Sequence, residues 1–141
     1  MVPINYFAVI LSAVASMIVG YLWYGPLFGK MWMELSGKSM DMMNDPAMKK
    51  VAMRGYAIQF VGSLLMAFVL AHAIVFAGAY LKVSGISAGL QGAFWNWIGF
   101  IAPATIGMVL WDGKPWKLWF INSGFFLVSL LVMGIILALW M

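Results

Sequence analysis

The chain has 141 residues, of which 65% are hydrophobic and only 9% charged, with a formal net charge of +4. A soluble domain usually carries about 25% charged residues, so this composition excludes an ordinary water-soluble protein and indicates that lipid is the solvent. The absence of cysteine excludes disulfides, thiolate metal sites and cysteine nucleophiles, and no basic patch is suited to a nucleic-acid backbone.

Four long stretches without charged side chains divide the chain. Each exceeds the roughly 20 apolar residues that cross a hydrocarbon core of about 30 Å as a helix. We predict membrane spans near residues 4–24, 55–76, 88–110 and 118–140. They should be helices, because unpaired peptide groups are costly in hydrocarbon and the stretches lack strand-like alternation. The fold class is therefore all-α, with residues 1–141 forming a single four-helix transmembrane domain.

The first span should end at a segment rich in aromatic residues. Pro26 lacks a backbone donor and disfavours helix in the residue before it, so Tyr24-Gly25-Pro26 should break the helix. The segment fits either an interfacial anchor or a site built on a broken helix end; its residues are Trp23, Tyr24, Gly25, Pro26 and Trp32. Residues 29–37 should then form a short interfacial helix. Its apolar face is Met31, Trp32 and Leu35, and its polar face is Lys30, Glu34 and Lys38.

The later connections carry helix-start signals. Asp45 should be the N-cap and Pro46 the first residue of a helix, and Ser87 is placed to cap the third span. The tight turn 112–115 should join the third and fourth spans as an antiparallel hairpin.

The basic residues predict the orientation. The first and third connections hold Lys30, Lys38, Lys49, Lys50, Arg54, Lys114 and Lys117, whereas the second holds only Lys82. Because cytoplasmic loops are enriched in Lys and Arg, loops 25–54 and 111–117 should be cytoplasmic and both termini outside.

A short internal similarity links the first and third spans. Leu22-Trp23-Tyr24-Gly25 ends the first and Leu110-Trp111-Asp112-Gly113 ends the third, and a Lys-x-Trp follows each. The pattern fits a two-fold repeat of helix pairs. It also fits two interfaces that recruit the same residue types, and the sequence leaves both open.

Several motifs resemble a known family. They are Asn5-Tyr6, the run Leu22-Trp-Tyr-Gly-Pro-Leu-Phe-Gly-Lys30 within 20–32, the run Lys114-Pro-Trp-Lys-Leu-Trp-Phe-Ile-Asn122, and the closing Met133-Gly134…Trp140. Together they resemble the bacterial domain-of-unknown-function family seventeen-sixty-one. The resemblance implies a small multi-pass protein of the bacterial cytoplasmic (inner) membrane. It implies no activity, so no catalytic residue is carried over.

Polar residues inside the spans define a candidate pocket. His72 is the only histidine, and Asn96, Trp95 and Trp97 are expected at comparable depth. They fit either an outward-facing polar pocket or a single interhelical hydrogen bond. Pro103 should kink the third span.

Small residues recur every four positions and predict close helix packing, because lipid supplies no hydrophobic force between helices. They are Ala8, Ser12, Ser16 and Gly20, then Ser63, Ala67 and Ala71, and finally Gly134 and Ala138. The stripes serve either the four-helix core or a neighbouring chain.

These features favour a non-enzymatic protein of packing or assembly type, either a homo-oligomer or an accessory subunit of a membrane complex. The alternative is a small-solute transporter or channel with a pocket around His72. We predict no cofactor and no metal site, since the methionines of residues 31–53 fit apolar packing better than Cu(I) binding. The expected partners are membrane lipid and either a second copy or another membrane protein, and no nucleic acid.

Overall fold

A computed structural model describes residues 2–140, and all regular secondary structure in that range is helical. Four helices are long and apolar enough to cross a membrane: Tyr6–Leu27, Pro46–Leu81, Gly85–Leu110 and Trp116–Leu139. The predicted all-α, four-span architecture of a multi-pass membrane protein is therefore confirmed.

The first of these helices consists of α1 (Tyr6–Leu22) and a π-helical segment, η1 (Trp23–Leu27). Two short helices follow, α2 (Gly29–Ser36) and α3 (Met40–Asn44), and then α4 (Pro46–Leu81). The third span consists of α5 (Gly85–Asn96), a second π-helical segment η2 (Trp97–Ile101), α6 (Ala102–Thr105) and α7 (Gly107–Leu110). The last span is α8 (Trp116–Leu139).

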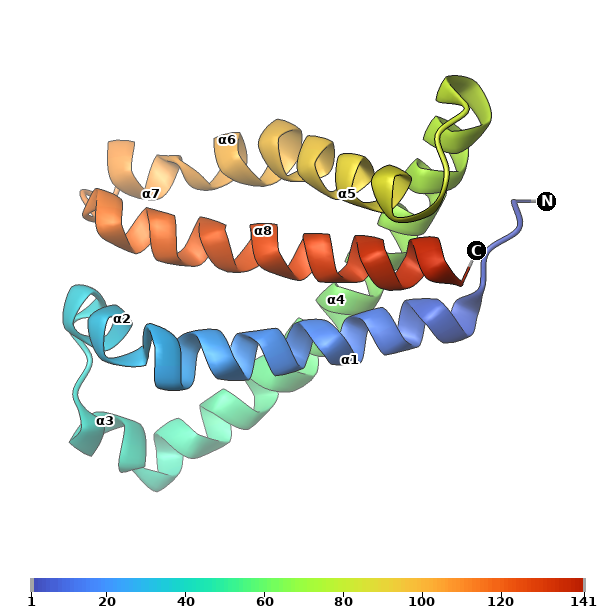
Figure 1. Ribbon diagram of the computed structural model, residues 1–141. Helices are drawn as coiled ribbons and strands as arrows, with labels where there is room; N and C mark the ends of the chain where they lie inside the picture. The colour runs from blue at the N-terminus through green and yellow to red at the C-terminus, as the bar shows by residue number, and fades with distance from the viewer. Residues whose placement is uncertain (1, 141) are drawn as a thin grey trace.

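The helices form a bundle in which α8 is central. It packs against α1, α4 and α5, while α4 crosses the others at a steep angle (Figure 1). The start of α1 and the end of α8 lie beside the α4–α5 connection, and we call this end of the bundle the terminal end (Figure 1). The helices α2 and α3 lie with the α7–α8 connection at the opposite end, the α2 end.

The start of α4 confirms one predicted signal and the start of α5 contradicts another. The carboxylate of Asp45 accepts a hydrogen bond from the Ala47 backbone N–H at 3.1 Å, and Pro46 is the first helical residue. The third span instead begins at Gly85, whose φ of 62° turns the chain before Ser87 is reached. Ser87 therefore lies inside α5 and is not its N-cap, and its hydroxyl accepts a hydrogen bond from the Gln91 side chain.

The helix does not break at Tyr24-Gly25-Pro26 as predicted. It widens into η1, where the Phe28 N–H donates to the Trp23 carbonyl five residues back at 2.8 Å. The wider turn accommodates Pro26 because the donor that proline lacks is replaced by the next one along the chain. The helix ends only at Phe28, and α2 begins at the next residue.

The small-residue stripes face the interior of this chain. Ala8, Ser12 and Ser16 are buried on α1, and Ser63, Ala67 and Ala71 are buried on α4. A Cβ atom at Gly20 would lie 3.3 Å from the Phe125 ring. The stripes therefore build the four-helix core.

The closest approach in the bundle joins α5 to α8. A Cβ atom at Gly89 would overlap the carbonyl oxygen of Gly134 and would lie 2.9 Å from the Ala138 Cβ, and a Cβ at Gly134 would in turn overlap the Gly89 carbonyl. Only glycine at both positions allows these two backbones to touch.

We expect Gly89→Ala to lower the free energy of unfolding by at least about 1–3 kcal/mol, because α5 and α8 must separate to admit the methyl group. The matched control is Gly55→Ala, since a Cβ at Gly55 meets nothing within 4 Å. Unfolding in mixed micelles, followed by circular dichroism, measures the difference. Equal stability of the two variants would contradict this packing.

Candidate functional site

Two segments far apart in the sequence meet near the α2 end. The indole N–H of Trp23 donates to the Ile121 carbonyl at 2.9 Å, and the Tyr24 hydroxyl donates to the Asn122 side-chain oxygen at 2.9 Å. Both donors come from η1 and both acceptors from α8. Both segments belong to motifs that carry the family resemblance, and the structure gives them a common role in joining the first span to the last.

Aromatic rings surround this junction. The Tyr24 ring lies edge-on to Phe125 and Trp32, with centroid distances of 5.3 and 5.6 Å. The Lys38 ammonium lies 4.6 Å from the Trp32 ring centroid, an arrangement that favours cation–π attraction. Trp32 therefore packs between Tyr24 and Lys38 instead of pointing its ring away from the protein. A Cβ atom at Gly124 would lie 3.2 Å from the Trp23 ring, so Gly124 makes room for that indole.

A second set of indole bonds joins the third span to α8. The Trp97 N–H donates to the Ser123 carbonyl at 2.8 Å. The Trp119 N–H donates to the Thr105 hydroxyl at 3.1 Å, and that hydroxyl donates to the Ile101 carbonyl at 2.7 Å. Both π-helical segments thus begin with a tryptophan that donates to a carbonyl of α8. These bonds connect neutral groups and orient helices.

The structure does not bring the four predicted pocket residues together. The Nδ1 atom of His72 lies 2.8 Å from the Phe68 carbonyl, and the Asn96 amide donates to the Gly92 carbonyl, each within its own helix. Trp95 is 66% exposed, whereas the Trp97 indole N–H donates to the Ser123 carbonyl on α8. Within residues 2–140, no hydrogen bond joins any two of the four.

An apolar crevice of about 350 Å³ lies between α4 and the third span, beside Asn96. Asn96 is its one polar lining residue, and His72 does not line it. The other lining residues are Leu65, Met66, Val69, Leu70, Phe100, Ile101 and Leu130.

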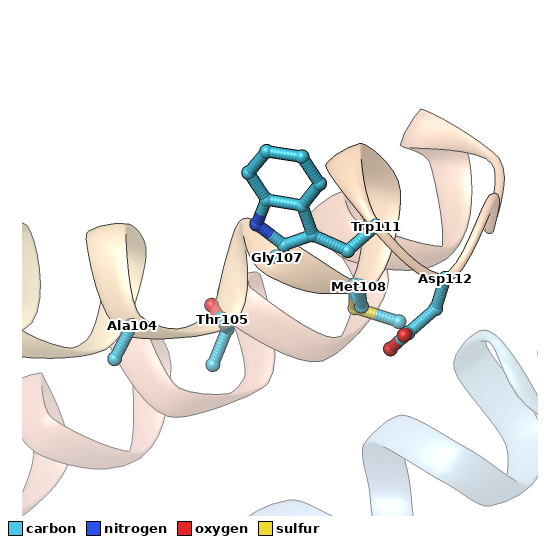
Figure 2. Close-up of a pocket in the computed structure, with 6 residues that line it drawn as sticks. All are labelled: Ala104, Thr105, Gly107, Met108, Trp111 and Asp112. Carbon is cyan, nitrogen blue, oxygen red and sulfur yellow. The ribbon is translucent and has the colours of Figure 1, made fainter.

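A second hollow, of about 420 Å³, opens at the α2 end along α6 and α7 (Figure 2). The Trp111 indole lies over Gly107, while the Asp112 carboxylate points away from the indole. Thr105 is already hydrogen-bonded to Ile101 and Trp119. The lining side chains spread along the helix and do not converge on one point. No group of three His, Cys, Asp or Glu that could hold a metal ion occurs in the part of the chain that the structure describes.

Gly89 and the carbonyl acceptors on α8 were not predicted from the sequence. Gly85, Gly89 and Ala93 recur every four residues, and this spacing could have identified the α5 side of the closest contact. Backbone carbonyls carry no side-chain signature, so Ile121 and Ser123 could not have been found as acceptors.

The family model for the protein of unknown function DUF1761 matches residues 7–138. The chain therefore belongs to this family, and the resemblance drawn from its motifs is confirmed. No curated protein and no solved structure matches the chain.

We expect Tyr24→Phe to lower the free energy of unfolding by about 1 kcal/mol, because the Asn122 oxygen loses its donor in a partly buried site. Tyr21→Phe is the matched control, since Tyr21 is 77% exposed and its hydroxyl makes no hydrogen bond to any of residues 2–140. In a double-mutant cycle, Asn122→Leu should remove most of the effect of Tyr24→Phe. Fully additive effects of the two substitutions would show that the pair does not interact.

Proposed function

We propose that this protein is a non-enzymatic multi-pass component of the bacterial cytoplasmic membrane that associates through its helices, as a homo-oligomer or as an accessory subunit of a larger membrane complex. The observation that carries the proposal is the exposure of the third span. Only 11% of its most apolar 18-residue stretch is buried, against 28% for the first and second spans and 44% for the fourth.

The backbone of this exposed span is irregular. It passes from α5 through η2 to α6, and a turn at Ile106 separates α6 from α7. Irregular backbone at membrane depth is tolerated where protein covers it or where it lines a water-filled cavity. Because the third span has little cover from its own chain, a neighbouring protein is the simplest source of cover.

The polar chemistry of the described residues supports association over transport. The carboxylates Glu34, Asp41, Asp45 and Asp112 all lie in connections between the spans. A proton- or cation-coupled carrier would normally place one inside a span. The span residues that do make side-chain hydrogen bonds between helices, such as Trp23 and Trp97, use them to hold α8. We propose no cofactor.

We further propose that the α2 end faces the cytoplasm. Seven of the eight basic residues lie in the segments 25–54 and 111–117, which are gathered at that end, and the positive-inside rule places such segments in the cytoplasm. In this orientation α2 is an interfacial helix, with the exposed Met31 toward lipid and Lys38 at the headgroup level. A repeat of helix pairs also stays a proposal. It rests on the match between residues 22–25 and residues 110–113 at the ends of the first and third spans.

Thiol labelling tests the orientation, since the chain has no cysteine of its own. Ser39→Cys and Ser84→Cys form a matched pair, because both serines are exposed N-cap residues, of α3 and α5 respectively. In intact spheroplasts, an impermeant maleimide should label Ser84→Cys at once and Ser39→Cys only after lysis. The reverse pattern would invert the proposed topology.

Purification from the native membrane in mild detergent tests the association. We expect a particle heavier than one chain, which contains either further copies or a second membrane protein. Chemical cross-linking in the intact membrane should give the same composition, which controls for loss in detergent. A single chain with lipid alone in both experiments would contradict the proposal.

A further inference from the structure

We propose that a second copy of this chain packs against the outward face of the third span, which consists of Trp95, Ile98 and Gly99. This inference rests on the proposed function and names the partner and the surface. The three residues lie at the junction of α5 and η2, on the side away from α8.

The indole of Trp95 is the first observation. Trp23, Trp97 and Trp119 each donate their indole N–H to a carbonyl or hydroxyl oxygen on another helix. Trp95 is 66% exposed and has no acceptor among residues 2–140. It lies roughly 15 Å along the helix from Gly85, at 1.5 Å per residue, so the headgroup region does not supply an acceptor. An indole N–H within hydrocarbon requires an oxygen from another protein surface.

The backbone beside Trp95 is the second observation. Pro103 has no N–H, so the Gly99 carbonyl lacks the donor that a regular helix would supply four residues later. The Ala102 N–H donates to the Trp97 carbonyl, which leaves the Ile98 carbonyl without its regular donor as well. Lipid chains offer no donor to either oxygen.

The space around Gly99 is the third observation. A Cβ atom at this position would meet nothing within 4 Å. Gly99 comes four residues after Trp95, which places both on one helix face. The Ile98 side chain on the neighbouring surface is 42% exposed. The face is therefore free of its own chain and lets another backbone approach closely.

A second copy fits this face better than an unrelated partner does. Two copies inserted in the same orientation, related by an axis along the membrane normal, bring the same face to the same depth. Each copy then offers an unpaired indole donor together with carbonyl oxygens that lack regular donors. The face carries no charge, so identical surfaces do not repel each other.

The test compares face variants with matched controls. Gly99→Leu blocks close approach, and its control Gly25→Leu makes the same change in the other π-helical segment, where a Cβ atom also meets nothing within 4 Å. Trp95→Phe removes the donor, and its control Trp111→Phe alters a more exposed tryptophan near the end of the span. The self-association constant is measured in lipid vesicles by energy transfer between labelled copies at a series of protein-to-lipid ratios.

We expect dimers of the wild type and of both controls. Trp95→Phe should weaken association about tenfold or more, since each dimer loses two indole hydrogen bonds. Gly99→Leu should abolish it. Helix content and thermal stability should match the wild type, and Trp95→Phe carries the test if Gly99→Leu does not fold.

Two results would overturn the inference. One is a wild type that stays monomeric at every protein-to-lipid ratio. The other is a dimer that both face variants retain. If the native membrane then yields a complex with a different protein, association stands and only the second copy and its face are refuted. If it yields a single chain, the proposed function fails as well.

Discussion

Every peptide group within the hydrocarbon must find its hydrogen-bond partner inside the protein, and the rest of this structure depends on that constraint. It makes the four apolar stretches helical, and the separate cost of a charged side chain in hydrocarbon confines the carboxylates to the connections. It also governs the helix ends. Asn5 accepts hydrogen bonds from the Phe7 and Ala8 N–H groups and donates to the Trp140 carbonyl at 3.1 Å. One side chain thus satisfies groups at the start of the first span and at the end of the last.

The central helix α8 is held in two physically different ways along its length. Toward the terminal end, Gly134 touches Gly89, and the gain comes from close backbone contact. Toward the α2 end, the indoles of Trp23 and Trp97 reach α8 carbonyls across wider gaps. Large rings and direct backbone contact exclude each other at one level of a bundle. The division therefore explains why Gly134 lies in one half of α8, whereas the Ile121 and Ser123 carbonyls that accept the indole bonds lie in the other.

The spans could be predicted because hydropathy and charge report directly on the hydrocarbon. The helix from Pro46 is longer than the predicted span 55–76, since a helix can continue beyond the apolar core with exposed Lys49 and Lys50 in its first turns. The Asp45 cap could be predicted because it depends only on neighbouring residues in the sequence. The π-helical segments could not be predicted, because a proline indicates a disturbed helix without specifying how the backbone rearranges. His72 and Asn96 were grouped by depth alone, and depth does not fix the direction in which a side chain points around its helix.

The third span is the least buried of the four, and we therefore propose a partner for its outward face. More generally, four helices cross the lipid with nearly all of their backbone hydrogen bonds formed inside the chain. Amide hydrogen exchange in lipid nanodiscs, resolved along the chain by mass spectrometry, tests it most directly. We predict four protected stretches, 6–27, 46–81, 85–110 and 116–139, separated by rapid exchange at the connections. Rapid exchange throughout any one of the four stretches would contradict it.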